Sequence, residues 1–243
     1  METTKVWNLL DTGGRDGAWN MACDLKLLAA AERKEIGPTL RFYRWEPPAV
    51  SLGATQKAEE EVSIEFCRRE GIPVVRRPSG GGAIFHDDEL TYSFVARTEA
   101  HPDFGDLLKS YYLIIEGLRR GLAGLGVPAD TRGGAGGGSP ERYLPCFALA
   151  SRHDLTSGGK KLIGSAQKRR RQAFLQHGSL PFSYRPELVN RIFLRPENFF
   201  EKATCLTETL GGRRPPETAV KQALQAGLES VFGCSFQGLE FKF

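Results

Sequence analysis

The sequence predicts an α+β fold with a mixed or antiparallel sheet. Short runs in which apolar and polar residues alternate, a pattern typical of half-buried strands, occur in both halves of the chain. Segments with apolar residues at helical spacing fall between them, but helices and strands do not alternate regularly. A doubly wound parallel sheet would need that regular alternation, so it is not expected. The chain also shows no internal repeat.

The first half of the chain begins with an amphipathic helix. Residues 19–34 carry apolar side chains at helical spacing and end in basic residues, which favour a helix C-terminus. A short helix is expected around 62–70, and the longest helical pattern of the chain covers 104–125. The expected strands of this half are 39–45, 49–54, 73–77, 83–86 and 90–97.

The second half opens with a segment that is rich in glycine and proline. These residues, 130–145, predict a loop. Strands dominate after it, and two helices precede the C-terminus. The expected elements are strands at 153–157, 160–165 and 172–182, helices around 185–192 and 215–232, and a final strand at 239–243.

Composition places the chain among ordinary globular proteins. It has 243 residues, of which 40% are hydrophobic and 26% are charged. We expect one domain over residues 1–243, with the part after about residue 185 carrying the least distinctive sequence. The formal net charge is +4. A charge of that size is too small to imply nucleic-acid binding by itself.

Cysteine usage and hydropathy exclude further classes. The five cysteines are far apart, their number is odd, and no CxxC pair occurs, so neither a disulfide framework nor a structural zinc site is expected. No apolar run approaches the roughly 18 residues of a membrane-spanning helix. The N-terminal residues also lack the apolar core of a signal peptide. We therefore expect a cytoplasmic protein with reduced thiols, no metal and no membrane partner.

A glycine run between two expected strands is the first candidate binding segment. Gly80, Gly81 and Gly82 would let the backbone approach a ligand closely and would offer N–H donors to an anion or a carbonyl. Arg76 and Arg77 beside them could fix a phosphate or a carboxylate. A glycine-rich hairpin turn with solvated arginines explains the composition equally well. Neither the P-loop nor the dinucleotide-binding fingerprint fits this segment.

Cys146, at the end of the glycine-rich loop, is the candidate nucleophile. A free thiol with a pKa of about 8.5 is only a few per cent thiolate at neutral pH. Lowering that pKa by about 1.5 units takes roughly 2 kcal/mol, and one ammonium at about 4 Å supplies on the order of 4 kcal/mol. Lys160 or Lys161 could supply this charge; only one of them can face inward in a strand, and the spacing does not decide which. The other cysteines are expected to be structural: Cys23, Cys67, Cys205 and Cys234.

A basic run, Lys168 to Arg171, is the third candidate segment. Such a run could bind RNA or an acidic protein, but a solvated strand face is the commonest outcome. No aromatic residues are interleaved with it, which weakens the nucleic-acid interpretation. We therefore expect no nucleic-acid partner.

Taken together, these segments resemble the lipoate-protein ligase and octanoyltransferase family. The matching blocks cover about residues 17–180, and their order and spacing make the resemblance specific. The blocks are Asn20-Met21-Ala22, Arg41-Phe42-Tyr43 with Trp45, Ser51-Leu52-Gly53 with Gln56, Arg76-Arg77 through Gly80-Gly81-Gly82 to His86-Asp87, Glu89-Leu90-Thr91-Tyr92-Ser93, Gly159 to Gln167, and Leu175 to Ser179.

The resemblance implies a biotin/lipoate protein ligase-like fold, in which a mixed sheet flanked by helices holds an acyl group. It implies Lys161 as the pocket lysine. Within the family, the segment from Cys146 to Lys161 resembles the octanoyltransferases that depend on a cysteine, which pair it with a lysine at this separation. Asp154, where that branch more often has glutamate, and the glycine-rich loop are departures, and neither touches the nucleophile.

The reaction that the resemblance implies is octanoyl transfer in lipoate biosynthesis. Cys146 would take octanoyl from octanoyl-acyl carrier protein and pass it to a lysine of a lipoyl-type domain, such as the glycine cleavage H protein or a 2-oxo-acid dehydrogenase lipoyl domain, with no cofactor. Lys161 would hold the thiolate. The expected substrate-binding residues are Arg77, Gly80, Gly81, Gly82, His86, Gly164, Ser165, Ala166 and His177. For the two histidines among them, a purely structural role is equally compatible with the sequence.

Three alternatives remain at this point. An amidotransferase that moves octanoyl or lipoyl between lipoyl domains would use the same cysteine and differ only in its donor. An ATP-dependent lipoate ligase would release pyrophosphate. A nucleic-acid binder would depend on the basic run and show salt-dependent binding.

Overall fold

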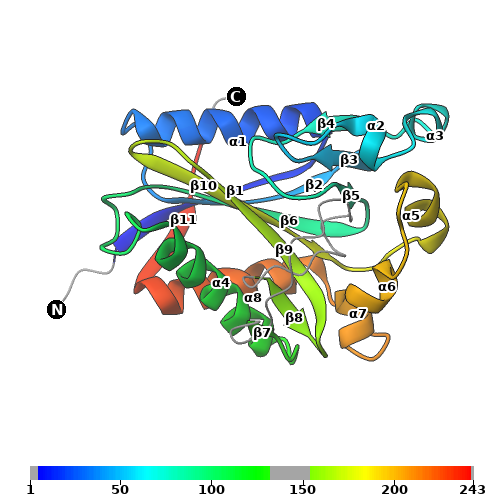
Figure 1. Cartoon of the computed structure of the whole chain (residues 1–243). Helices are drawn as coiled ribbons and strands as arrows, with labels where there is room; N and C mark the ends of the chain where they lie inside the picture. Colours follow the sequence, from blue (N-terminus) through cyan, green and yellow to red (C-terminus); the bar gives the residue numbers. More distant parts are fainter. Residues whose placement is uncertain (1–4, 132–153, 242–243) are drawn as a thin grey trace.

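The computed structural model describes residues 5–131 and 154–241 of the chain (Figure 1). Its helices are α1 (Gly17–Glu32), α2 (Ala58–Glu61), α3 (Ile64–Arg69), α4 (Leu107–Gly124), α5 (Pro186–Ile192), α6 (Phe199–Lys202), α7 (Leu206–Thr209) and α8 (Glu217–Phe232). Its strands are β1 (Lys5–Arg15), β2 (Thr39–Trp45), β3 (Ala49–Leu52), β4 (Val74–Arg76), β5 (Ile84–His86), β6 (Glu89–Arg97), β7 (Asp130–Thr131), β8 (Leu155–Ser157), β9 (Lys160–Arg169), β10 (Ala173–Pro181) and β11 (Cys234–Gly238).

The strands form two sheets. The larger has eight strands in the order β11-β1-β2-β6-β10-β9-β8-β7, and the smaller has three in the order β4-β3-β5. In the larger sheet β1 runs parallel to both β11 and β2, whereas the pairs from β2–β6 onward are antiparallel. The sheet is therefore mixed, as the sequence predicts.

Helices cover both faces of the larger sheet (Figure 1). On one face α1 packs through Leu27 and Leu28 against Leu175 of β10. On the other face α4 and α8 pack against Phe94 and Phe174, in a cluster that holds most of the buried aromatic side chains. The smaller sheet lies beside one end of α1, near α2 and α3, and packs with α3 and α5 into a cluster of its own.

The long helices begin and end at residues suited to those positions. The Asp16 side chain accepts a hydrogen bond from the Trp19 N–H at 2.9 Å and caps α1, and Asp106 does the same for α4 through the Lys109 N–H at 2.8 Å. Helix α8 ends at Gly233, whose φ of +59° suits glycine. The predicted helices over 19–34, 104–125 and 215–232 are confirmed, with small shifts of their boundaries.

Small residues allow α4 and α8 to pack closely. A Cβ on Gly227 would lie 2.1 Å from the Gly117 carbonyl oxygen, so a larger residue could not stand there without separating the helices. This contact fixes the layer beneath the sheet.

One strand of the sheet was not predicted, and the position of another was predicted wrongly. The sequence pattern does not predict the first strand, β1, because most of its side chains are partly or fully exposed; only Trp7 and Leu10 are buried. The final strand is expected at 239–243, but β11 covers Cys234–Gly238 and residues 239–241 lie outside any strand. Pairing with β1 sets this position, because the parallel register ends at the pair Leu9–Gly238.

Candidate active site

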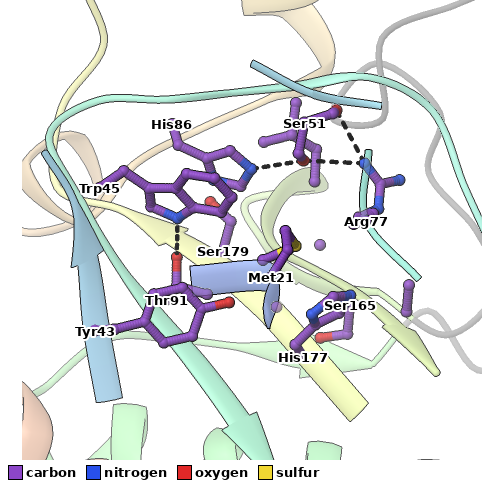
Figure 2. Close-up of a pocket in the computed structure, with 14 residues that line it drawn as sticks. Met21, Tyr43, Trp45, Ser51, Arg77, His86, Thr91, Ser165, His177 and Ser179 are labelled. Carbon is purple, nitrogen blue, oxygen red and sulfur yellow. Dashed lines mark hydrogen bonds between the residues drawn. The ribbon is translucent and has the colours of Figure 1, made fainter. Parts of the chain in front are cut away.

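A narrow pocket lies between the two sheets, under the end of α1 (Figure 2). Its volume is about 20 Å³, enough for about one water molecule. Both sheets and α1 contribute side chains to its wall. The lining residues are Met21, Tyr43, Trp45, Ser51, Arg77, Ile84, His86, Thr91, Gly164, Ser165, Ala166, His177, Gly178 and Ser179.

The structure gathers most of the sequence-predicted substrate-binding residues in this pocket. Arg77, His86, His177 and the segment Gly164 to Ala166 all line it, although they come from distant parts of the chain. The three glycines at 80–82 are not among the lining residues. Their assignment as substrate-binding residues stays a prediction.

Glycine makes part of the pocket floor where β9 and β10 pair. Gly178 stands opposite Ser165 in the antiparallel register. A Cβ on Gly178 would lie 2.5 Å from the Ser165 Oγ and 2.8 Å from the Gly164 carbonyl oxygen, which real Cβ atoms do not tolerate. The Ser165 Oγ is also bonded to the Tyr92 hydroxyl at 2.8 Å. The floor therefore has no room for a side chain at residue 178.

His86 forms one wall of the pocket through a stack with Trp45. The two ring centroids are 3.9 Å apart, with an angle of 9° between the planes. The His86 Nδ1 lies 2.9 Å from a carboxylate oxygen of Glu89, and the Nε2 lies 2.7 Å from the Ser51 Oγ. A carboxylate only accepts hydrogen bonds, so Nδ1 carries the proton and Nε2 accepts from the Ser51 hydroxyl. Both ring nitrogens therefore have partners inside the protein.

Burial sets the charge state of His86. The side chain is 3% exposed. Burial lowers the pKa of His86 from its ordinary value, although the neighbouring Glu89 acts in the opposite direction. The imidazole is therefore neutral at pH 7.

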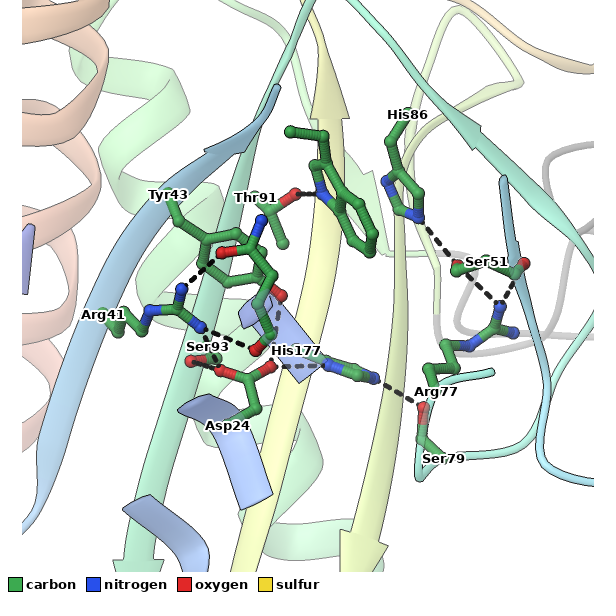
Figure 3. A network of polar contacts seen from close by, with 12 residues as sticks. Asp24, Arg41, Tyr43, Ser51, Arg77, Ser79, His86, Thr91, Ser93 and His177 are labelled. Carbon is green, nitrogen blue, oxygen red and sulfur yellow. Dashed lines mark hydrogen bonds and ion pairs between the residues drawn. The ribbon is translucent and has the colours of Figure 1, made fainter. Parts of the chain in front are cut away.

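His177, on the other side of the pocket, is held in the same manner by a second carboxylate (Figure 3). Its Nδ1 lies 3.2 Å from the Asp24 Oδ2, and its Nε2 lies 2.5 Å from the Ser79 Oγ. Asp24 is fully buried and also accepts hydrogen bonds from Arg41 at 2.7 Å and Ser93 at 2.9 Å. This network links α1, three strands and the glycine-rich turn.

Asp24 is ionised despite its burial. Burial acts to raise the pKa of Asp24, but the hydrogen bond from His177 and the charge of Arg41 outweigh it and hold that pKa below its ordinary value. Tyr43 donates its hydroxyl to the same carboxylate at 3.1 Å, and burial raises the pKa of Tyr43 well above its ordinary value. The carboxylate thus has a full set of donors.

The buried Arg77 side chain holds the glycine run at 80–82 in place through hydrogen bonds. Its guanidinium donates to the carbonyl oxygens of Gly80 at 2.8 Å and Gly82 at 2.7 Å. It also donates to the Ser51 carbonyl at 3.0 Å and the Ser51 Oγ at 3.1 Å. Arg77 is 4% exposed, so the interpretation of a hairpin turn with a solvated arginine is wrong for this residue. Arg76 instead donates hydrogen bonds to the carbonyl oxygens of Gly53, Ala54 and Gln56.

The two candidate lysines differ sharply in their surroundings. Lys161 is 2% exposed, and its Nζ lies 2.8 Å from a carboxylate oxygen of Asp154, itself 1% exposed. Lys160 is part-exposed and pairs with Glu208 at 3.0 Å. Lys161 is therefore the buried lysine of the two. It is not among the described residues that line the pocket, so its role as the pocket lysine stays a prediction. It lies on β9, three residues before the pocket-lining Gly164.

The predicted nucleophile, Cys146, lies outside the described residues, so its pairing with Lys161 stays a prediction. The other four cysteines are all buried, as expected for structural residues. Burial raises the pKa of Cys23 and of Cys234 to about 12. Over residues 5–131 and 154–241, no cluster of histidine, cysteine and acidic side chains is arranged to hold a metal ion.

The basic run is only partly solvated. Lys168, Arg170 and Arg171 are exposed, and Arg170 pairs with Glu32 at 2.9 Å. Arg169 instead turns back onto α4, where it donates to the Ser110 Oγ at 3.0 Å.

Sequence reasoning missed several residues of this site. Asp24, which holds His177, was not singled out, because an acidic residue in an amphipathic helix is usually solvated. Ser79, which directly precedes the glycine run at 80–82, was not singled out either. Met21, Tyr43 and Trp45 were noted for the resemblance but not assigned to the pocket. Polar residues inside otherwise apolar strands, such as Arg41, were the available signal.

A mixed sheet flanked by helices, with a narrow pocket beside a second small sheet, is the fold of lipoate protein ligases of known structure. Two of these structures overlay on nearly the whole chain. Lipoate-protein ligase A bound with ATP covers 98% of this chain and 89% of its own, with a TM-score of 0.73 at 23% identity. The bipartite lipoate protein ligase of Thermoplasma acidophilum was reported with its E2 lipoyl domain. It covers 97% of this chain and 88% of its own, with a TM-score of 0.74 at 22% identity. At these identities the likeness establishes the fold.

The chain belongs to the lipoyl protein ligase A/B catalytic domain family, whose model matches residues 16–229. Among curated relatives, a protein named octanoyltransferase LipM from Symbiobacterium thermophilum is 43% identical over 96% of this chain and 88% of its own length. A protein of the same name from Moorella thermoacetica is 37% identical over 96% of this chain and 88% of its own length. The resemblance found in the sequence is thereby confirmed.

In the part of the chain that the structure describes, none of the helices is long and apolar enough to cross a membrane.

Proposed function

We propose that the protein is an octanoyltransferase of lipoate biosynthesis. It moves an octanoyl group from octanoyl-acyl carrier protein, through a thioester on Cys146, to a lysine of a lipoyl-type acceptor. The acceptor is the glycine cleavage H protein or a lipoyl domain of a 2-oxo-acid dehydrogenase. The names of the curated relatives support the acyl group and the reaction class. The E2 lipoyl domain that accompanies the Thermoplasma acidophilum ligase supports the kind of acceptor.

The observation that carries the proposal is the character of the pocket. Both histidines that line it, and Ser51 and Thr91, are already hydrogen-bonded to other protein groups. A polar ligand would therefore gain few new hydrogen bonds there, whereas an alkyl chain would meet Met21, Ile84 and the Trp45 ring. Burying an octanoyl tail at about 0.8 kcal/mol per methylene contributes on the order of 5 kcal/mol.

The pocket must widen to admit that tail. A volume of about 20 Å³ holds roughly one water molecule, far less than eight carbons. Met21 at the end of α1 lines the pocket with an unbranched side chain, which rearranges more readily than a ring or a β-branched group. Entry of the acyl chain therefore displaces side chains rather than filling a void.

Cys146 and Lys161 carry the chemistry in this proposal. The Cys146 thiolate attacks the donor's thioester carbonyl; a new C–S bond forms, and the carrier's thiolate leaves. The acceptor amine then attacks the acyl-enzyme, the C–N bond forms and the cysteine thiolate leaves. The acyl group arrives already activated, so the reaction needs no ATP. Lys161 supplies a fixed positive charge for the thiolate and the developing oxyanion.

Substrate contacts are assigned to the residues around the pocket. Backbone N–H groups of Gly164 to Ala166, or of the glycine run at 80–82, would stabilise the oxyanion. Arg77, His86 and His177 would frame the acyl group through the arrangement already described.

Mass spectrometry of the acyl-enzyme tests the proposal. Mixing the protein with octanoyl-acyl carrier protein is expected to add one octanoyl group, located on Cys146 by peptide mapping. The added group should disappear when the glycine cleavage H protein is supplied. Transfer at the normal rate by Cys146→Ala would refute the mechanism.

Two further assays distinguish an octanoyltransferase from a lipoate ligase and from an amidotransferase. Lipoate-dependent release of pyrophosphate from ATP, the signature of a ligase, is expected to be absent. Octanoyl-acyl carrier protein and an octanoylated lipoyl domain, supplied side by side as donors, will show which thioester or amide the enzyme accepts. A faster reaction with the octanoylated domain would identify an amidotransferase instead.

A further inference from the structure

The turn that joins β9 to β10 presents positive charge at the surface (Figure 1). Lys168, Arg170 and Arg171 are all exposed there. Arg170 forms an ion pair with Glu32 at 2.9 Å. Lys168 and Arg171 form no ion pair with any residue in 5–131 or 154–241. Two uncompensated positive charges therefore stand at this turn.

Backbone hydrogen bonds hold the turn in place. The Arg170 N–H donates to the Ala173 carbonyl oxygen at 2.8 Å, and the Thr98 N–H donates to the Gln172 carbonyl oxygen at 2.9 Å. The backbone that carries the two cations is thus already ordered. A partner that binds them has only to order their side chains, which lowers the entropic cost of binding.

Lys168 lies on the face of β9 that forms the pocket. In the antiparallel register Ala166 stands opposite His177, and Lys168 stands opposite Leu175. Opposed residues of paired strands share one face of a sheet, and the side chains of His177 and Leu175 both contact α1. The Cα of Lys168 is therefore about 7 Å along the strand from that of Ala166, which lines the pocket.

Exposed apolar side chains lie beside the turn, at the start of α4. Leu107 is 49% exposed and Leu108 is 48% exposed. Arg169 connects this helix end to the turn, because it donates to the Ser110 Oγ at 3.0 Å and to a main-chain carbonyl just before the helix at 3.2 Å. Leu107 is one helical turn before Ser110. Together these residues form what we call the turn surface: Leu107, Leu108, Lys168 and Arg171.

The composition of the turn surface is that of a protein interface. Protein–protein interfaces combine a buried apolar centre with a polar, charged rim. The two leucines provide the first and the two cations provide the second. Charges at a rim mainly accelerate association with a partner of opposite charge. The turn surface therefore fits a partner that is acidic and carries apolar side chains of its own.

Charge decides which of the two proteins in the proposed reaction fits. The donor carries its acyl group on an arm attached through a phosphodiester, so it brings a negative charge that lysine and arginine bind. The acceptor presents a lysine, whose positive charge two uncompensated cations repel. Lys168 also stands close along β9 to the pocket that receives the acyl chain. The donor is thus the better match.

We propose that the acyl carrier protein docks on the turn surface when it delivers its acyl group. Anionic groups of the carrier pair with Lys168 and Arg171. Its apolar side chains pack on Leu107 and Leu108. The inference rests on the proposed octanoyltransferase function and names the surface that recognises the donor.

Two donors with the same acyl group provide the test. One is octanoyl-acyl carrier protein, and the other is octanoyl-pantetheine, a thioester with neither protein nor phosphate. The rate at which the enzyme takes up one octanoyl group is measured with each donor, by mass spectrometry, below the saturating donor concentration. Docking contributes only to the first rate. Uptake from octanoyl-pantetheine also shows that a variant is folded.

The expected result of charge reversal is a selective loss. The double variant Lys168→Glu/Arg171→Glu should load from the carrier protein about tenfold or more slowly than wild type at low salt, because electrostatic steering accelerates association by such factors. Its loading from octanoyl-pantetheine should match wild type. The loss should diminish as salt is added, since salt screens exposed charges. Arg171→Glu alone decides the matter if the double variant loads from neither donor.

Matched controls carry the same changes elsewhere on the surface. Arg68→Glu/Arg213→Glu reverses two exposed cations that likewise form no ion pair with a described residue, and it should load normally from both donors. Leu108→Ser should slow loading from the carrier protein by several fold. Leu194→Ser, in which the leucine is also 48% exposed, should not.

Each other outcome overturns the inference. If the Lys168→Glu/Arg171→Glu variant loads from the carrier protein at the rate of its control, the donor docks elsewhere and the proposed function still stands. If both donors slow equally, these residues act on the pocket. If only transfer from the loaded enzyme to the glycine cleavage H protein slows, the surface recognises the acceptor. If wild type takes up octanoyl from neither donor, the proposed function fails, and this inference fails with it.

Discussion

The Nζ of Lys161 lies 2.8 Å from a carboxylate oxygen of Asp154, and both side chains are almost completely buried. A buried ion pair stabilises a fold weakly, but breaking it leaves an uncompensated charge. A carboxylate beside the lysine also offsets the positive charge that a neighbouring thiolate would feel. We therefore expect that removing Lys161 and removing Asp154 change the reactivity of the Cys146 thiol in opposite directions.

Removing the lysine should make the catalytic thiol less acidic. In Lys161→Met the positive charge is lost, so the pKa measured by alkylation of Cys146 should rise by about one unit or more, and acyl-enzyme formation at pH 7 should slow by about tenfold or more. The pH dependence of iodoacetamide labelling, read at the Cys146 peptide, measures this directly. Cys23 and Cys234 provide an internal reference, since burial raises the pKa of each thiol to about 12.

An unchanged alkylation pKa in Lys161→Met would remove the role assigned to the lysine. Lys160→Met is the matched control, because Lys160 is part-exposed and pairs with Glu208. It should leave the labelling curve of Cys146 where it is in wild type.

Removing the carboxylate should have the opposite effect on the thiol. In Asp154→Asn the carboxylate that offsets the Lys161 charge is lost, so a Cys146 thiolate beside that lysine would feel more positive charge and the alkylation pKa of Cys146 should fall. The same change should lower the free energy of unfolding by about 3–5 kcal/mol, as for other buried pairs broken on one side. Urea unfolding monitored by circular dichroism gives the second quantity. A rise in the alkylation pKa would contradict this account.

The ionised Asp24 predicts a dependence of stability on pH. Its pKa in the folded protein is below its ordinary value, so its contribution to stability is present above the unfolded-state pKa of about 3.9 and is lost as the pH falls through the folded-state pKa. Asp24→Asn should therefore unfold more easily than wild type at pH 7, by about 3–5 kcal/mol. The difference should shrink as the pH falls below about 4.

Thermal unfolding of wild type and of Asp24→Asn at several pH values shows whether the stability difference shrinks or grows as the pH falls. Glu59→Gln is the control, because Glu59 is an exposed carboxylate on the short helix α2. Its unfolding curve should follow that of wild type throughout. A gap between Asp24→Asn and wild type that widens in acid would show that the Asp24 pKa is raised rather than lowered by folding.

Local patterns predicted the parts of the fold that local physics determines. The helical spacing of 19–34, 104–125 and 215–232 leads to buried faces in α1, α4 and α8. The order of strands in the sheet was not predicted, because it depends on which distant segments pair. β1, with a weak pattern of its own, is a strand because β11 and β2 lie on its two sides.

In the site, too, local sequence predicted some features and only tertiary packing determined the others. Motif resemblance located His86, His177 and Gly164 to Ala166, and all of them line one pocket. It did not reveal that each histidine is bound by a serine and a carboxylate, since Asp24 is 153 residues away from its partner in the chain. Those contacts exist only once α1 packs on the sheet. Sequence motifs thus indicated the pocket, and tertiary packing determined the state of its groups.

Gly178 provides a test of the pocket floor that is independent of charge. A methyl group there would lie 2.5 Å from the Ser165 Oγ and 2.6 Å from a Tyr92 ring carbon, so β9 and β10 would have to separate. Gly178→Ala should lower the free energy of unfolding by about 1–3 kcal/mol. It should also slow octanoyl uptake, because residue 178 lines the pocket and the added methyl group takes up space there. Gly124→Ala, at the end of α4 with nothing within 4 Å of the added carbon, is the matched control and should change neither quantity adversely. Normal octanoyl uptake by Gly178→Ala would show that the acyl chain does not pass over this part of the sheet.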